Sequence, residues 1–178
     1  YDADCLIKIT SDKECSDFLT KNHIEGDCCG NIKLGLYYNE KLLSVMTFKQ
    51  CEENNSTANC YQMHRLGSEL NHSIVGGASK LLSHFIKEYS PKSIISYADR
   101  RYFDGKLYET LGFTKKHISK PNYFYTQDFS ILESRIKYQK HKLSKLLPNF
   151  DPNLTESLNM FNNGYRRIWD CGNLVYVL

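Results

Sequence analysis

The sequence predicts a mixed α/β domain followed by a basic helical and β-hairpin extension. Three observations predict this class. Runs of β-forming residues alternate with segments of helical periodicity, short turn signals separate them, and no internal repeat or low-complexity tract is present. Over residues 5–127 the expected order is β-α-β-β-β-α-β-α-β-β, which is typical of a mixed central sheet flanked by helices.

The first half of the chain carries one helix among its strands. Ser11 is a suitable N-cap residue, and Glu14 stands at the capping-box position three residues later, so a helix is expected from residue 12 through Leu19. Alternating or continuous runs of β-forming residues predict four strands here, over residues 5–9, 32–38, 42–48 and 60–66.

The middle of the chain has the clearest helical periodicity. It predicts a helix from residue 79 to residue 89, ended by Pro91, because apolar side chains recur at helical spacing at Leu81, Leu82, Phe85, Ile86 and Tyr89. A shorter helix over residues 106–111 ends at Gly112. Three further strands are expected over residues 93–98, 113–117 and 123–126.

A change of pattern near residue 128 divides the chain into a core (residues 1–128) and an extension packed on it (residues 129–178). The extension is expected to begin with a basic helix over residues 135–147, whose partial apolar stripe is Ile136, Leu143, Leu146 and Leu147. A second helix is expected over residues 153–161. The turn Cys171-Gly172-Asn173 between two β-rich runs, residues 165–170 and 174–177, predicts a terminal hairpin.

Composition excludes several classes of protein. With 178 residues, 41% hydrophobic and 24% charged, the chain is expected to be soluble and globular rather than disordered, and no apolar run approaches the length of a membrane span. It opens on Tyr1 without an initiator Met, so we expect a processed product or a fragment. The seven cysteines form no CxxC pair, which favours reduced thiols in a cytosolic protein over a zinc framework.

The excess positive charge lies entirely in the extension. Residues 1–128 balance 16 basic against 16 acidic side chains, whereas residues 129–178 carry seven basic and four acidic ones. The asymmetry favours a polyanionic partner such as DNA, and a solvated helix face is the alternative. The seven candidate nucleic-acid contacts are Arg135, Lys137, Lys140, Lys142, Lys145, Arg166 and Arg167. Exposed members of the thirteen tyrosines would stack on bases, or they pack against the sheet.

A segment of small residues precedes the longest predicted helix. Such a turn lets backbone N–H groups at a helix N-terminus bind phosphate. It lacks the order of a Rossmann or P-loop motif, so the alternative is a tight turn into a packed helix. The candidate cofactor-binding residues are Ile74, Val75, Gly76, Gly77, Ala78 and Ser79.

Two motifs resemble the GNAT superfamily of acyl-CoA-dependent N-acyltransferases. Residues 73–78 match its loop Gln/Arg-x-x-Gly-x-Gly/Ala except that Ser73 replaces the first residue, and Tyr108 through Phe113 matches Tyr-x-x-x-Gly-Phe. The resemblance implies acetyl-CoA with its pyrophosphate on the loop amides. It also implies a thioester between two splayed strands, those of Arg65 and Tyr97, and Tyr108 as proton donor to the departing thiolate. A packed core aromatic is the alternative for Tyr108.

A narrower resemblance concerns phage proteins. Asn22-His23, Arg65, Tyr97-Ala98-Asp99 and Tyr108 resemble the pattern of Mom-like proteins, which modify DNA adenine. The whole chain is similar to the C-terminal domain of phage Hef-like homing endonucleases, with similar Gly-Gly-Ala-Ser-Lys-Leu, Ser-Tyr-Ala-Asp-Arg-Arg and Asp-Cys-Gly-Asn stretches. This resemblance implies an amine on DNA as acceptor and the bacterial cytoplasm during phage infection as location.

Four residues are therefore candidates for catalysis: Tyr108, Asp99, Arg65 and His23. Asp99 would orient or deprotonate an amine, or else caps a turn or pairs with Arg100. Arg65 would hold an anionic or carbonyl group, or forms a surface ion pair. His23 is a base or a loop residue, and with Asp99 it supplies too few ligands for a metal site. Three functions stay open: DNA-amine acetyltransferase, inactive DNA-binding accessory domain, and small-molecule or peptide N-acetyltransferase.

Overall fold

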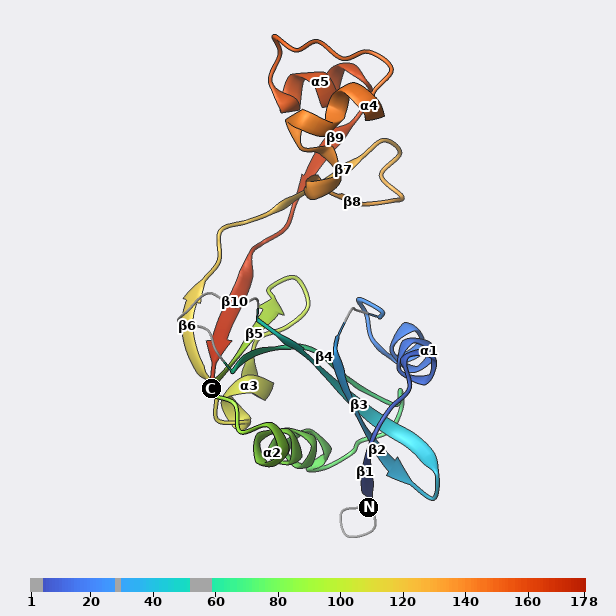
Figure 1. The fold of residues 1–178 in the computed structure, drawn as a ribbon, viewed down its shortest axis with the longest axis vertical. Coiled ribbons are helices and arrows are strands. Elements are labelled where there is room, and N and C mark those ends of the chain that lie inside the picture. Colours follow the sequence, from blue (N-terminus) through green and yellow to red (C-terminus); the bar gives the residue numbers. More distant parts are fainter. Residues whose placement is uncertain (1–4, 28–29, 52–58) are drawn as a thin grey trace. The chain divides into compact units, whose positions relative to one another are not determined.

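The chain forms two compact units. The computed structural model describes residues 5–27, 30–51 and 59–178 (Figure 1). The large unit comprises Tyr1–Ala98, Asp104–His117 and Leu174–Leu178, and the small unit comprises Asp99–Phe103 and Ile118–Asn173.

The large unit is built on a seven-stranded mixed sheet in the order β1-β2-β3-β4-β5-β10-β6. Strands β1 to β4 pair antiparallel in sequence order, and β4 and β5 pair parallel. Ile94 and Leu178 exchange both backbone hydrogen bonds, which is an antiparallel pattern for β5 and β10. The predicted mixed sheet is confirmed. Its strands are β1 (Leu6–Ile9), β2 (Ile32–Tyr38), β3 (Lys41–Gln50), β4 (Cys60–Ser68), β5 (Ser93–Asp99), β6 (Thr114–Ile118) and β10 (Asn173–Val177).

Helices cover both faces of this sheet (Figure 1). Helix α2 (Gly77–Tyr89) packs Leu81 and Phe85 into the main core, where Phe85 stacks on Phe48 of β3. Helix α1 (Asp12–Asn22) packs Leu19 against Val45, which is also on β3. Side chains alternate between the two faces along a strand, so Val45 and Phe48, three residues apart on β3, point to opposite faces. The two helices that contact them therefore lie on opposite sides of the sheet. A short third helix, α3 (Lys106–Thr110), follows β5.

The helix boundaries follow local chemistry. The Glu14 amide donates to the Ser11 hydroxyl at 3.2 Å, which confirms the predicted N-cap of α1. Helix α2 begins after Gly76, whose φ of +73° is a left-handed conformation that glycine adopts without steric cost. It ends at Ser90, immediately before Pro91.

Strands β4 and β5 separate partway along their length. Their parallel pairing runs from Cys60 opposite Ser93 only to Met63 opposite Ser96, although both strands continue further. A β-bulge in β4 occurs at the same level, because Thr47 pairs with Arg65 while Phe48 pairs with Met63. Bulges increase local twist and bend a strand. The splayed strands expected for this fold class are therefore present.

The small unit has its own three-stranded sheet, β8-β7-β9, and its own core. Strand β7 (Tyr123–Thr126) pairs antiparallel with both β8 (Glu133–Ser134) and β9 (Arg166–Trp169). Helix α5 (Glu156–Asn162) contributes Met160 to the core. The other buried members of this core are Tyr125, Tyr138, Leu143 and Leu147.

The predicted basic helix over residues 135–147 is wrong. The segment contains two 3₁₀ turns, η1 (Arg135–Tyr138) and η2 (Lys140–Lys142), and a single α-helical turn, α4 (Leu143–Leu146). Gln139 between the two 3₁₀ turns is extended, with ψ of 141°, because Tyr138 is buried in the aromatic core of the unit. The expected stripe fails for the same reason: Ile136 and Leu146 are exposed.

The predicted terminal hairpin is also wrong, because its two strands do not pair with each other. Strand β9 pairs with β7 in the small sheet, whereas β10 lies between β5 and β6 in the large one. The turn at Gly172 is real, with φ of +71°. It joins strands of different sheets, and a local turn signal cannot reveal which partner each strand takes.

We predict that Gly105→Ala destabilises the large unit far more than Gly112→Ala. Both glycines have nearly equal φ, +85° and +87°, so both substitutions carry left-handed strain of about 1–2 kcal/mol. A Cβ at Gly105 would also overlap the ring of buried Tyr176, while at Gly112 it meets Leu178 at 3.8 Å. Gly105→Ala should therefore cost about 3 kcal/mol or more. Urea unfolding followed by far-UV circular dichroism measures both, and equal losses would contradict this packing argument.

Candidate functional site

The loop before α2 and the first turn of this helix present unpaired backbone amides. Within the described residues, the N–H groups of Val75, Gly76, Ala78 and Ser79 donate no hydrogen bond, and the first intrahelical bond is from Lys80 to the Gly76 carbonyl at 2.9 Å. Unpaired amides at a helix N-terminus attract anions through their dipoles. These four residues were among the predicted cofactor-binding residues, and their amides are available to a ligand.

Gly77 and Ile74, the other two predicted cofactor-binding residues, bond to each other and shape the turn. The Gly77 amide donates to the Ile74 carbonyl at 3.2 Å, so it closes the turn. A Cβ at Gly77 would lie 2.8 Å from Ile74 Cγ2 and 3.2 Å from a methyl group of Leu36. Close packing against the sheet therefore requires glycine here, which matches the tight-turn alternative at this one position.

The Tyr108 hydroxyl lies where β4 and β5 separate. Ser96 Oγ is 3.1 Å from the Tyr108 hydroxyl and 2.9 Å from the Met63 carbonyl, and Met63 and Ser96 are the last pair of the parallel ladder. Ser96 has a single hydroxyl proton to donate to one or the other. The phenol is thus fixed at the closed end of the gap between the two strands by a hydrogen bond to β5 itself.

The α3 turn and a second tyrosine orient Tyr108. Its ring stacks on Tyr176 with centroids 5.0 Å apart, and its carbonyl accepts the Phe113 amide at 2.9 Å across the turn at Gly112. Burial raises the pKa of the Tyr108 phenol. The hydroxyl is therefore protonated at neutral pH, as a hydrogen-bond or proton donor must be.

Arg65 connects β4 to the loop after α1. Its guanidinium forms an ion pair with Glu25 at 3.2 Å and donates to the Gly26 carbonyl at 3.3 Å. Arg65 and Glu25 shift the pKa of Tyr108 in opposite directions, so the pair lies within electrostatic range of the phenol. Both side chains are only partly buried. Arg65 is thus neither a simple surface pair nor a free anion-binding group.

His23 is bound to the same loop. Its Nδ1 accepts the backbone amide of Glu25 at 3.1 Å. Burial, followed by the positive charge of Arg65, lowers the pKa of His23, and the same two causes lower the pKa of His64. A neutral imidazole that already accepts at Nδ1 is poorly placed to take a further proton. Because both folded-state pKa values lie below the unfolded value of about 6.5, these groups make stability decline as pH falls below that value.

Asp99, the last residue of β5, is held by its own chain segment. Arg101 donates to both carboxylate oxygens, with Nε–O distances of 3.1 and 3.0 Å, and the Arg101 amide adds a bond of 2.9 Å. These contacts lower the pKa of Asp99. The carboxylate is an ionised structural anchor, paired with Arg101 rather than Arg100. Such a saturated carboxylate is a weak base.

The structure brings Tyr108, Arg65 and His23 together and gives Asp99 other partners. Glu25 and Ser96 complete the cluster, and sequence reasoning missed both. Glu25 lies in an aperiodic Gly-containing loop, and Ser96 is one small residue in an apolar strand, so neither carries a pattern. His64 Nε2, at the bulge, is buried without a hydrogen bond to any described residue, as is Glu69 Oε2.

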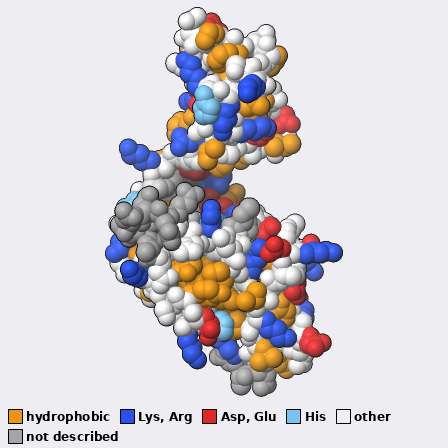
Figure 2. All heavy atoms as spheres, in the orientation of Figure 1, with side chains coloured by type: hydrophobic (Ala, Val, Ile, Leu, Met, Phe, Trp, Pro, Cys, Tyr) orange, Lys and Arg blue, Asp and Glu red, His pale blue; other side chains and the backbone are white. Residues whose placement is uncertain are grey.

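The seven predicted nucleic-acid contacts differ in their environments. Arg167 points inward, with its guanidinium 4.3 Å from the Tyr123 ring centroid, and Lys137 pairs with Glu133. Figure 2 shows several Lys and Arg side chains on the visible face of the small unit. Side chains with no ion pair to any described residue are Arg135, Lys140, Lys142, Lys145 and Arg166.

Among the described residues, no group of three His, Cys, Asp or Glu side chains could hold a metal ion. Among the helices described above, none combines the length and the hydrophobicity that crossing a bilayer requires.

We predict that Arg65→Gln raises the pKa of both His23 and His64, because it removes a positive charge that lowers each. Histidine proton signals followed by NMR across pH 4–8 measure both shifts. Unchanged curves for His23 and His64 would show that Arg65 lies farther away than its ion pair with Glu25 implies.

Comparison with known proteins gives a fold. No family model matches the sequence, and no curated protein matches it. Arabidopsis thaliana Naa50, in complex with the bisubstrate analogue CoA-Ac-MVNAL, is 14% identical with a TM-score of 0.54 over 99% of both chains. The ribosomal-protein-S18-alanine N-acetyltransferase from Escherichia coli is 10% identical with a TM-score of 0.55, over 98% of this chain and 92% of its own.

A third similar structure carries the family name. It is a Desulfovibrio desulfuricans protein assigned to the GNAT family of acetyltransferases, 9% identical with a TM-score of 0.55 over 98% of both chains. Such low identities show a shared fold. The mixed sheet, the parallel strands that separate and the helix that follows the amide-rich loop all belong to that fold, so this chain has the fold of the GNAT acetyltransferases.

Proposed function

We propose that the protein is an N-acyltransferase that uses acetyl-CoA. The observation that carries the proposal is a pair of features in the large unit. Four amides at the start of α2 have no partner among the described residues, and a gap separates β4 from β5 with the Tyr108 hydroxyl at its closed end. The amides suit a pyrophosphate, and a strand edge without a ladder partner suits the amide groups of a pantetheine chain.

The residues present fit acetyl-CoA. Val75, Gly76, Ala78 and Ser79 would hold the pyrophosphate through their N–H groups. Acetyl-CoA supplies a thioester whose C–S bond breaks as the acceptor nitrogen forms an amide, while the nitrogen loses one proton and the sulfur gains one. The protein's task is to bind both partners and to move those two protons.

Tyr108 serves the sulfur side of the reaction. Its phenol is protonated at neutral pH and is held at the strand split by Ser96. A thiol has a pKa of about 8.5, well below that of a buried phenol, so Tyr108 stabilises the departing thiolate chiefly by hydrogen bonding.

Glu25 serves the nitrogen side. Glu25 is a carboxylate close enough to Tyr108 for its charge to shift the pKa of the phenol. Carboxylates accept protons from reacting amines. Arg65 fixes its position through the ion pair, and the His23 ring fixes its backbone. His23 and Arg65, two of the four predicted catalytic residues, thus act as positioning residues in this proposal, and Asp99 acts as a structural one.

An amine on DNA is our preferred acceptor. The support is the small unit, which carries ten Lys and Arg side chains against six Asp and Glu, a net charge of +4, whereas the large unit carries −1. A phage enzyme of the Mom-like kind that acts in the bacterial cytoplasm is the form of this proposal that the sequence resemblance favours. If acetyl-CoA does not bind, the alternative is a domain with this fold that binds DNA and transfers no acyl group.

A peptide amine is the second candidate acceptor. Two of the similar structures are, by their names, an alanine N-acetyltransferase for a ribosomal protein and a protein bound to a CoA–peptide analogue. They share the fold at 10% and 14% identity, so they support peptide acetylation only by analogy.

We predict that Ser79→Glu weakens binding of acetyl-CoA by about tenfold or more, because it puts a negative charge beside the proposed pyrophosphate site. Ser79 is exposed, and an acidic residue in the first turn stabilises a helix, so the fold should be retained. Isothermal titration calorimetry measures the affinity. The matched control is Ser83→Glu, also exposed and one turn further along α2, which should change affinity less than twofold. No acetyl-CoA binding to the unmodified protein at millimolar concentration would refute the transferase proposal.

We predict that Glu25→Gln lowers kcat about 100-fold, the usual contribution of a general base, with little change in KM for acetyl-CoA. Tyr108→Phe removes the hydroxyl but keeps the stacked ring, and it should lower kcat by about tenfold or more. Release of free thiol measures both rates. Asp99→Asn is the comparison variant and should lower kcat much less than Glu25→Gln does. An equal loss of kcat would indicate that Asp99 is catalytic.

The pH profile distinguishes the two acceptors. A peptide α-amine has a pKa of about 7.7–8.0 and reacts only when neutral, so kcat/KM should rise roughly tenfold from pH 6.5 to pH 8. An exocyclic base amine is already neutral, so its profile should be nearly flat in that range. Transfer of radiolabelled acetyl groups to single-stranded DNA and to a short peptide measures both. Transfer to neither, with acetyl-CoA bound, would exclude both acceptors.

A further inference from the structure

A pocket of about 210 Å³ lies entirely within the small unit. It is lined by Tyr123, Arg135, Ile136, Gln139 and Glu156, which supply an aromatic ring, a guanidinium, an alkyl chain, a carboxamide and a carboxylate. None of these residues belongs to the proposed acyl-transfer site. This mixture of groups differs from the wholly apolar lining of a packing cavity. It is typical of a site for a polar, planar ligand.

Aromatic and cationic groups pack around Tyr123, one of the residues that line this pocket. The Tyr123 ring has the Arg167 guanidinium at 4.3 Å and the Arg135 guanidinium at 5.4 Å from its centroid. Trp169 pairs directly with Tyr123 across β7 and β9, with ring centroids 4.9 Å apart, and is 57% exposed. An exposed indole beside stacked arginines is a platform for the face of another π-system.

Polar groups at the pocket can form hydrogen bonds with the edge of a planar ligand. Glu156 Oε1 accepts the hydroxyl protons of Tyr123 and Tyr125 at 3.1 and 3.0 Å, which fixes the carboxylate. Its other oxygen and the Gln139 carboxamide make no hydrogen bond to any described residue. A free carboxylate oxygen accepts from an exocyclic amino group, and a carboxamide both donates and accepts, as the edge of a nucleobase demands.

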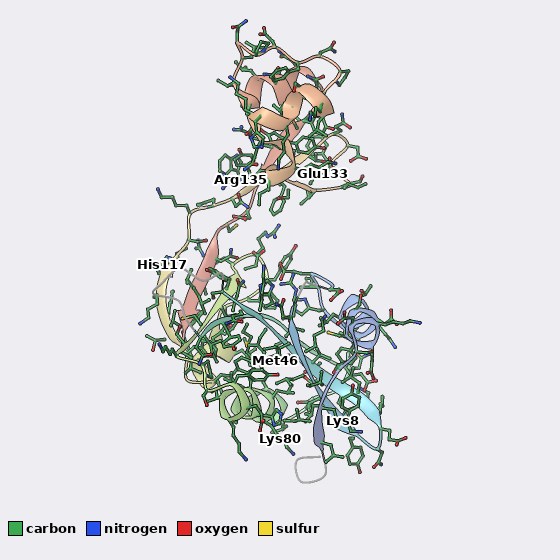
Figure 3. All side chains as sticks on the ribbon, viewed as in Figure 1. Lys8, Met46, Lys80, His117, Glu133 and Arg135 are labelled. Carbon is green, nitrogen blue, oxygen red and sulfur yellow. The ribbon has the colours of Figure 1, made fainter. Side chains whose placement is uncertain are left out.

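Positive charge lies on the same chain segment. Arg135 contacts the pocket, and Lys140 follows the pocket residue Gln139 directly. Lys140 and Lys145 are exposed and form no ion pair with the residues that the structure describes. Figure 3 shows Arg135 beside Glu133, where β8 passes into η1. Phosphates linked to a base in the pocket would meet these cations.

We propose that the small unit binds single-stranded nucleic acid, with one unpaired base in the pocket and backbone phosphates at Arg135, Lys140 and Lys145. A single strand is favoured over a duplex because the pocket groups need the face and edge of a base, which pairing and stacking conceal. The inference deepens the DNA-acceptor part of the proposed function. It depends on the small unit alone and not on acetyl-CoA.

The single tryptophan of the chain gives a direct test. A 12-nucleotide single-stranded DNA of mixed sequence should quench Trp169 fluorescence in a saturable way, with an affinity that falls as salt rises. The same sequence as a duplex should bind at least about fivefold more weakly, and inorganic polyphosphate should not quench. Equal binding of the duplex, or equal quenching by polyphosphate, would overturn the base pocket.

Two variants separate the base from the phosphates. Gln139→Ala should weaken single-strand binding about fivefold and leave the salt dependence unchanged, because it removes no charge. Lys140→Ala should reduce the slope of log affinity against log salt by about one. Lys87→Ala, at an exposed position of α2 in the large unit, is the matched charge control and should change neither quantity. No effect of Gln139→Ala on a stably folded protein would overturn the proposed base contact.

Calorimetry with acetyl-CoA on the same samples distinguishes the two proposals. Acetyl-CoA binding without fluorescence quenching by the single strand would overturn the nucleic-acid site and leave the transferase proposal intact. Quenching without acetyl-CoA binding would support the nucleic-acid site and refute the transferase proposal.

Discussion

The end of hydrogen bonding between β4 and β5 after Met63 and Ser96 is the constraint on which the rest of the large unit depends. A parallel pair that continued would fill the space where the phenol of Tyr108 lies and would satisfy the strand groups beyond it. The bulge at the same level of β4 supplies the bend. Because β3 still holds the other edge of β4, the gap opens without loss of the sheet.

Packing against the sheet positions the start of α2. Gly77 fits against Leu36 of β2, which lies in the same core as Leu81 and Phe85 of α2. The helix therefore has one position on the sheet, and the amides of its first turn have one direction. Their availability is a consequence of tight packing behind them. This is how an ordinary hydrophobic core produces a polar site at its edge.

The small unit follows a different principle. Its core is built from tyrosines whose hydroxyl groups require partners, and Glu133, Glu156 and Arg167 supply them. Burial and the hydrogen bond to Glu156 raise the pKa of Tyr125 to about 12, although the hydrogen bond from Arg167 acts in the opposite direction, so this phenol stays neutral. Such a network fixes charged groups near the surface. Tyr123 and Glu156, which belong to this network, also line the pocket that suits a planar polar ligand.

Local sequence determined the strands, the cap at Ser11, the turns at Gly76 and Gly112, and the two motifs around residues 73–78 and 108–113, because each depends on neighbours a few residues away. Tertiary structure alone decided the partners of β9 and β10, the break at Gln139, and the meeting of Glu25, Arg65 and Tyr108. Those outcomes depend on which distant surfaces become buried together. Asp99 is the clearest case: its sequence position left open a base, a turn cap or a pair with Arg100, and hydrogen bonds from Arg101 to both carboxylate oxygens made it an anchor.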